Sequence, residues 1–331
     1  MLTLAACGDA SRDTTLVVRS TLPDELLDYV EESFEAANPR VDVRFSALGA
    51  EESLAEATAA GRAAFDVWWG APATTLAQAA DAGLLLAYRP PWISEGGVGQ
   101  PDALARWQVT LVSPFVIAFN REEVPLARAP TDWGDILHFR WAEEVYLLDP
   151  SSSDEGAYFL GAMLVQSLRD DDDLLRGFDW QRRLDIQAER YVRDPQDAIR
   201  SLANGEAMLA ILPRYVVEEA RGTGAPWIHY RLPESGTPML ALGIAIIEST
   251  EVPSVARRFV DHVGTMDVAT ASKLHTRWQP SHGDVDMSRF PDDFELEQRW
   301  IPYALAIDTL VRELDGWVER WDAEVRDRGG R

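Results

Sequence analysis

Between residues 16 and 83 the sequence alternates three times between a short apolar segment and a longer amphipathic one, and this order limits the folds open to the chain. In the first longer segment Leu26, Val30 and Phe34 recur at four-residue spacing, which is typical of a helix with one buried face. The short segments have the length and apolar content of strands; they are 16–18, 41–45 and 65–69. A strand–helix order repeated in this way predicts an α/β fold with a mostly parallel, doubly wound sheet.

A second set of alternating segments predicts another lobe of the same kind. The long apolar run 109–120, interrupted at Ser113 and Pro114, suits a strand that crosses between two lobes. Further strands are expected at 145–148, at 208–212 and, returning to the first lobe, at 239–247. In the tail, apolar residues at helical spacing are Ile307, Leu310, Leu314, Trp317 and Trp321. We therefore expect residues 1–13 to be a tether, 14–112 with 240–275 to be lobe 1, 113–239 to be lobe 2, and 276–331 to be a C-terminal helical tail packed on the lobes.

The composition excludes several classes of protein. Fifty-five acidic and 31 basic residues give a formal net charge of −24, and a chain this acidic repels the phosphate backbone of nucleic acids. No apolar run approaches the ~18–20 residues of a membrane-spanning helix. The one cysteine, Cys7, rules out an internal disulfide and a multi-cysteine metal cluster.

The position of Cys7 carries its own indication. Leu4-Ala5-Ala6-Cys7 resembles a bacterial lipobox, in which the cysteine is lipidated and becomes the mature N-terminus. Because a basic segment and a long apolar stretch are missing before it, we expect the chain to start late or to be shortened at this end. The alternative is a chance cysteine. The lipobox predicts a protein in the periplasm or at the outer face of the cytoplasmic membrane, held there by its lipid alone.

The sequence lacks the common catalytic signatures, and we expect no enzymatic activity, no metal and no cofactor. It contains no GxxxxGK[ST] phosphate loop, no GxSxG nucleophile elbow and no HExxH. The histidines are scattered without the spacing of metal ligands; they are His138, His229, His262, His275 and His282.

Polar residues and glycines follow several expected strands, at the edge where doubly wound sheets bind ligands. They are Ser20 and Thr21, Trp69 and Gly70, Ser113 at the crossover, Ser151, Ser152 and Ser153, and Arg214 and Tyr215. Hydroxyl groups and free N–H groups at helix starts form a ready anion site. Serine and threonine also cap helices without binding a ligand, and each loop taken alone is open to that interpretation.

Six segments together resemble the extracellular solute-binding proteins of bacterial ABC importers, in particular the type II group that includes ferric-ion, phosphonate and sugar-phosphate binders. The segments are 16–23, 65–70, 116–120, 149–153, 204–208 and 239–247, and the likeness covers the chain from Leu16 to about His282. The resemblance implies two lobes joined by crossing strands, a ligand cleft between them and hinge closure on a small solute. It also implies delivery to a membrane permease, and we expect a monomer.

The resemblance also assigns residues to ligand loops. Ser20 and Thr21 match the first loop, Trp69 and Gly70 the second, Ser151 to Ser153 the third, and Tyr215 the fourth. Ferric binders of this group commonly have two adjacent tyrosines where this chain has Arg214 and Tyr215, and the family's Ser-Gly-Thr after Asp-Pro is replaced. An arginine beside hydroxyl groups suits a phosphonate, an organophosphate or a carboxylate. We expect an anionic solute, with ferric ion, thiamine or a polyamine as alternatives.

Three points stay open in the sequence. Arg214 is also placed to pair with Glu218 one helical turn later. Trp68 and Trp69 alternate along a strand, so one should face the core and the other the cleft. If Trp69 faces the cleft, it would stack on an organic or cationic group. The alternative function is a sensor or docking scaffold on the same fold, which would use the C-terminal tryptophans Trp317 and Trp321.

Overall fold

The computed structural model describes residues 14–60, 63–93, 102–281, 285, 289–290 and 300–326. The lipobox and Cys7 lie outside these residues, as does His282. Within the described part of the chain, no helix is both long and apolar enough to cross a membrane.

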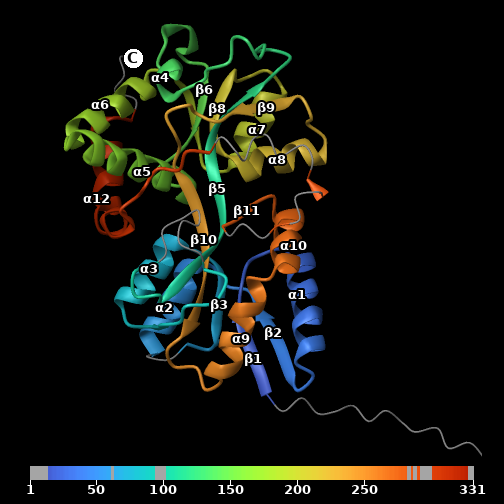
Figure 1. The fold of residues 1–331 in the computed structure, drawn as a ribbon. Helices are drawn as coiled ribbons and strands as arrows, with labels where there is room; N and C mark the ends of the chain where they lie inside the picture. The colour runs from blue at the N-terminus through green and yellow to red at the C-terminus, as the bar shows by residue number, and fades with distance from the viewer. Residues whose placement is uncertain are drawn as a thin grey trace, which may run out of the picture.

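The chain forms two lobes, which Figure 1 shows one above the other. Lobe 1 contains β1 (Thr14–Arg19), β2 (Val41–Ser46), β3 (Val67–Pro72), β4 (Leu85–Leu86), α1 (Asp24–Ala37), α2 (Ala50–Ala60), α3 (Ala73–Asp81), α9 (Pro253–Val263) and α10 (Met266–Thr276). Lobe 2 contains α4 (Trp133–Ile136), the 3₁₀ segment η1 (Phe139–Trp141), β6 (Val145–Leu148), α5 (Asp154–Asp171), α6 (Leu174–Asp185), β7 (Ala188–Val192), α7 (Pro195–Ala203), β8 (Leu209–Pro213), α8 (Arg214–Thr223) and β9 (Ile228–Arg231). The remaining elements are the long strands β5 (Trp107–Asn120) and β10 (Met239–Ile247), the short strand β11 (Gln279–Pro280) and the helix α12 (Ile307–Glu324).

The strands pair in the order β2-β1-β3-β10-β5-β8-β6-β7. In lobe 1, β1 is parallel to β2 and β3; in lobe 2, β6 is parallel to β7 and β8. β10 runs antiparallel to both β3 and β5, and β5 continues into lobe 2 beside β8. The predicted fold is therefore confirmed: two α/β lobes joined by crossing strands.

Each lobe has apolar cores on both faces of its sheet. In lobe 1 one face packs Leu16 and Val18 against α1 and α9, and the other packs Trp68 against α3. β5 is buried along its whole length, since it is covered in both lobes. Strand ends, and not strand faces, are thus the positions from which polar residues can meet another molecule.

The C-terminal tail is only partly helical, which corrects the expectation for 276–331. Residues Gln279 and Pro280 form β11 and pair with β5, and the described residues 300–306 form no helix. The predicted helix is present as α12, and its tryptophans are buried: Trp317 is 6% exposed and Trp321 is 1% exposed. The docking-scaffold alternative relied on these two tryptophans to bind a partner. Both side chains pack on lobe 2, so they are not available on the surface for that role.

Candidate functional site

The loop that follows β1 packs against the end of β3 at the edge of lobe 1. Ser20 is buried, and its Oγ accepts a hydrogen bond from the Leu22 N–H (3.2 Å), whereas Thr21 is exposed. Gly70 has φ of 85°, and a Cβ placed on it would lie 2.8 Å from Leu22 Cγ. A glycine at this position therefore permits both the positive φ near the end of β3 and the close approach of the loop that contains Leu22.

Three helices begin at strand ends directly after a proline, without a capping side chain. The prolines are Pro23 before α1, Pro72 before α3 and Pro213 before α8. The first turn of α1 carries two carboxylates, while the first turns of α3 and α8 carry none. The positive ends of α3 and α8 are therefore not neutralised by an acidic side chain in the same turn.

The sheet register places these two helix starts on either side of the crossing strands. Pro72 lies opposite Leu242 of β10, which in turn lies opposite Leu111 of β5. Pro213 lies opposite Phe115 of β5, four residues further along. One helix start thus belongs to each lobe, and both lie next to the strands that join the lobes.

The two tryptophans of β3 do not divide between core and cleft as expected. Trp69 is 1% exposed and meets the edge of Phe259 in the core of lobe 1 (centroids 6.3 Å apart). Trp68 is 3% exposed and packs on Phe65 on the other face of the sheet. The pleat does separate the two indoles, but helices cover both faces, so the stacking role predicted for Trp69 is not supported.

In lobe 2, two of the predicted site residues meet through Glu155, and a third, Ser113, contacts one of them. The Tyr215 hydroxyl donates to Glu155 Oε1 (3.2 Å) and the Ser153 hydroxyl donates to Oε2 (3.2 Å). The Tyr215 N–H donates to Ser113 Oγ (3.1 Å), which connects the start of α8 to the crossover strand. Ser153 Oγ also accepts a hydrogen bond from the Gly156 N–H and therefore caps α5. Helix capping was the alternative interpretation of the serines in this loop. Sequence reasoning missed Glu155, whose one signal was its place in the first turn of a helix.

The surroundings of Tyr215 are negative. Burial raises the pKa of its phenol well above the ordinary value, and the carboxylates of Glu155, Glu219 and Asp194 raise this pKa further. The phenol therefore stays protonated and donates its hydrogen bond at neutral pH.

The Tyr215 ring also stacks on Trp278, with centroids 4.8 Å apart and planes 21° from parallel. Trp278 belongs to the apolar core of lobe 1, so this stack joins the two lobes. Nothing in the sequence around Trp278 distinguishes it from the other tryptophans, so no local pattern indicates this contact.

Arg214 lies in an internal network. Its side chain is almost fully buried, and its Nε donates to the Tyr230 hydroxyl (2.8 Å), which donates to Glu218 Oε1 (2.8 Å). Arg214 Nη2 lies 3.8 Å from Glu218 Oε1, so the pairing considered as the alternative is present. The expectation of an anionic solute cannot therefore be based on the Arg214 charge.

Ser151 and Ser152 are exposed on the loop between β6 and α5, and Asp149 organises that loop. Asp149 Oδ1 accepts from the Ser151 N–H (2.9 Å), and Arg326 donates to both carboxylate oxygens. Burial raises the pKa of the Asp149 carboxyl. The hydrogen bonds from Arg326 and Ser151 together lower it by more, so this pKa lies below its usual range. Among the described residues, no group of three or more His, Cys, Asp or Glu side chains could hold a metal ion.

Comparison with solved structures defines the class of protein. The chain is similar to the periplasmic binding protein P5PA (21% identity, 94% of this chain and 99% of that one, TM-score 0.67). It is also similar to AfuA from Actinobacillus pleuropneumoniae with fructose-6-phosphate bound (19%, 95% and 99%, TM-score 0.70) and to iron-bound HitA from Pseudomonas aeruginosa (16%, 93% and 99%, TM-score 0.76). The fold is that of the two-lobed periplasmic binding proteins.

The sequence itself gives the family. Residues 16–271 match the family described as bacterial extracellular solute-binding protein, and the chain belongs to it. A probable ABC transporter periplasmic-binding protein of Sinorhizobium fredii, y4fP, is 23% identical over 98% of this chain and 90% of its own length. The resemblance to type II substrate-binding proteins of ABC transporters is confirmed, and homologues of this kind bind solutes and are not enzymes.

Proposed function

We propose that this protein captures a small organic phosphate or phosphonate between its lobes and delivers it to the permease of an ABC importer. The observation that carries the proposal is the pair of helix starts at Pro72 and Pro213, one in each lobe, whose N-cap residues provide no side-chain cap and whose first turns carry no acidic side chain. At the start of α8, Ser113 Oγ accepts one N–H group, that of Tyr215. N–H groups and the helix dipole at such ends favour a phosphoryl group. The fructose-6-phosphate bound to AfuA is consistent with this class of solute.

The carboxylates near Tyr215 indicate what the rest of the solute carries. Glu155 accepts hydrogen bonds from Ser153 and Tyr215, and two further carboxylates raise the pKa of the same phenol. A group that donates hydrogen bonds, such as a hydroxyl or an ammonium, suits this side of the site better than a second anion.

The same phenol and carboxylate favour a second candidate, a cation. Oxygen ligands of this kind suit hard metal ions such as ferric ion, and a negative wall suits thiamine or a polyamine. The two candidates predict opposite effects of added negative charge near α3.

The experiment is a thermal-shift screen followed by titration calorimetry of the protein and two variants. The probes are fructose 6-phosphate, methylphosphonate, ferric ion, thiamine and spermidine. Thr74→Asp adds a carboxylate in the first turn of α3, and Gln78→Glu adds the same charge further along this helix as the matched control.

For a phosphorylated solute we expect Thr74→Asp to weaken binding about tenfold or more and Gln78→Glu to change it less than twofold, because repulsion is strongest where the anion binds. Thr74→Asp should meanwhile stabilise the unliganded fold slightly, since an acid suits a helix start. Ferric ion, thiamine or spermidine binding that Thr74→Asp leaves equal or stronger would favour the cation and contradict the proposal.

We further propose that a lipid on Cys7 anchors the protein, as a monomer, outside the cytoplasmic membrane. The proposal rests on the lipobox-like residues 4–7. Labelled palmitate should enter the protein produced in a bacterial host that lipidates such cysteines, and Cys7→Ala should abolish the label. Equal labelling of both would contradict the anchor.

A further inference from the structure

Arg326, two residues after the end of α12, is tied to the loop between β6 and α5 by a two-pronged ion pair. Arg326 Nη1 donates to Asp149 Oδ2 (2.9 Å) and Arg326 Nη2 donates to Asp149 Oδ1 (2.5 Å). One turn earlier, the Ser151 hydroxyl donates to Asp322 Oδ1 (3.4 Å), and Arg326 Nε donates to that same oxygen (2.5 Å). The Arg326–Asp149 and Ser151–Asp322 contacts join residues that lie more than 170 positions apart in the chain.

Asp149 in turn determines the shape of this loop. Its side chain accepts from the Ser151 N–H, and its backbone carbonyl accepts from the N–H groups of Ser152 (3.1 Å) and Ser153 (2.8 Å). A Cβ on Gly156 would lie 2.9 Å from the Asp149 carbonyl, so the first turn of α5 rests directly on this backbone. A displacement of Asp149 would therefore move the three serines and the start of α5 together.

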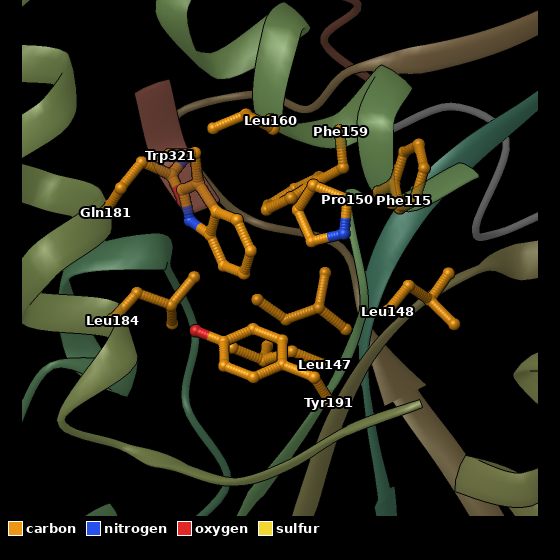
Figure 2. Close-up of a pocket in the computed structure, with 12 residues that line it drawn as sticks. Phe115, Leu147, Leu148, Pro150, Phe159, Leu160, Gln181, Leu184, Tyr191 and Trp321 are labelled. Carbon is orange, nitrogen blue, oxygen red and sulfur yellow. The ribbon is translucent and has the colours of Figure 1, made fainter. Parts of the chain in front are cut away.

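Packing beneath the loop does not hold it by itself. A cavity lies below it, lined by Pro150 and Gly156 of the loop region and by Trp321, Tyr191 and Gln181 opposite (Figure 2). The Gln181 side chain is buried, and its amide nitrogen has no hydrogen-bond partner among the described residues. The Asp149 N–H also donates to the Val192 carbonyl (2.9 Å), so the polar contacts from Asp322 and Arg326 add to this restraint where side-chain packing under Pro150 is incomplete.

Arg326 is itself held in place. Its guanidinium lies over the rings of Trp321 (4.9 Å) and Tyr191 (5.7 Å), and these two rings meet edge to face. The first half of α12 packs on lobe 1 through Ile307 and Val311, which adjoin the core that contains α3. One helix thus reaches from lobe 1 to the loop of lobe 2.

We propose that Arg326 and Asp322 position the β6–α5 loop for solute binding, so that the C-terminal end of α12 and the residues just after it set the affinity of the site without touching the solute. This inference rests on the proposed function, in which Ser151 to Ser153 belong to the solute site. Arg326 is a positioning residue, and it acts through Asp149.

The test compares Arg326→Met with Arg320→Met on the same helix. Arg320 pairs with Glu324 and lies over Phe178, away from the loop, so its loss costs the helix similar contacts. Calorimetry with fructose 6-phosphate, or with whichever phosphonate the wild-type protein binds, gives the dissociation constant, and hydrogen exchange of residues 150–156 without solute reports on the loop.

We expect Arg326→Met to weaken binding about tenfold and to speed exchange in the loop, while Arg320→Met leaves both within about twofold. Arg326→Lys should recover part of the affinity, because lysine keeps the charge but not the two-pronged geometry. In a double-mutant cycle, Asp149→Asn should cause little further loss once Arg326 is replaced.

Equal dissociation constants for the two methionine variants would overturn the inference, and so would unchanged exchange in Arg326→Met. Exchange needs no solute, so it separates this inference from the proposed function. If the wild-type protein binds no phosphorylated probe while exchange still rises in Arg326→Met, the proposed function fails and the positioning of the loop stands.

Discussion

At Gly70 the end of β3 meets the loop that follows β1, and a single substitution there separates backbone strain from packing. Gly70→Ala should destabilise the fold by about 2–4 kcal/mol, because a positive φ costs an alanine about 1–2 kcal/mol and the new Cβ presses on Leu22. The control is Gly83→Ala, where φ is +72° and no atom lies within 4 Å of the new Cβ. Urea unfolding of both variants measures the difference, and equal losses would show that Leu22 yields without cost.

Arg214 offers a second prediction at this scale, since its buried network separates a role in stability from a role in binding. Arg214→Met should lower the free energy of unfolding by about 1–3 kcal/mol, because Glu218 and the Tyr230 hydroxyl lose a charged partner. Affinity for the solute, measured by calorimetry on the folded variant, should change less than threefold. A large loss of affinity with unchanged stability would return Arg214 to the solute site.

Individual residues show how far sequence reasoning reaches. Ser153 and Tyr215 could be chosen because strand ends of such a sheet form its ligand edge. Glu155 and Trp278 could not, since the partners of a surface acid or a tryptophan depend on how two lobes come together. Trp69 was misjudged because alternation along a strand gives the face on which a side chain lies, but not what covers that face.

The helices α5 and α12 each contain a glycine, and the two glycines have different effects. Gly161 of α5 permits close packing, whereas Gly316 of α12 weakens its helix. Gly161 of α5 lies where α12 packs, and a Cβ there would overlap the Leu310 side chain and approach Leu314 Cδ1 at 2.8 Å. Gly316 of α12 is exposed, with no atom within 4 Å of a new Cβ. The same substitution should therefore have opposite effects at these two positions.

We expect Gly316→Ala to stabilise the protein by about 0.5–1 kcal/mol, because alanine loses less conformational freedom in a helix. Gly161→Ala should destabilise it by about 1–3 kcal/mol through crowding between the helices. Chemical denaturation of the two variants checks both signs. A stabilising Gly161→Ala would mean that α12 shifts freely on α5. A helix that shifts freely would not hold the β6–α5 loop in place, so this result would also count against the proposed positioning of that loop.

Elements with a clear period were predictable, whereas short strands were not. β10 and β6 have the predicted bounds, Met239–Ile247 and Val145–Leu148, because both are apolar runs with polar flanks. β11 has two residues, Gln279 and Pro280, and exists only because β5 offers it an edge. The pairing of β11 with β5 joins segments far apart in the chain, so the local sequence pattern around Gln279 does not predict it.

For the whole molecule, the net charge of −24 is the property with the broadest consequence. Like charges in a compact fold repel one another, and unfolding moves them apart, so part of the stability is lost to this repulsion. Salt reduces it: the screening length falls from ~30 Å at 0.01 M to ~10 Å at 0.1 M. At these salt concentrations, the general effect of salt on the burial of apolar surface stays small.

Raising sodium chloride from 0.01 to 0.1 M at pH 7.5 should therefore raise the melting temperature, by roughly 2 °C for each ~1 kcal/mol of repulsion removed. The protein is its own control at pH 4.5, near its calculated isoelectric point, where acidic and basic charges balance and screening has little net repulsion to remove. Differential scanning calorimetry at the two pH values and the two salt concentrations gives the four temperatures needed. The same rise at both pH values would assign the effect of salt to something other than the net charge, and the surface acids would then lie in local pairs instead of repelling across the fold.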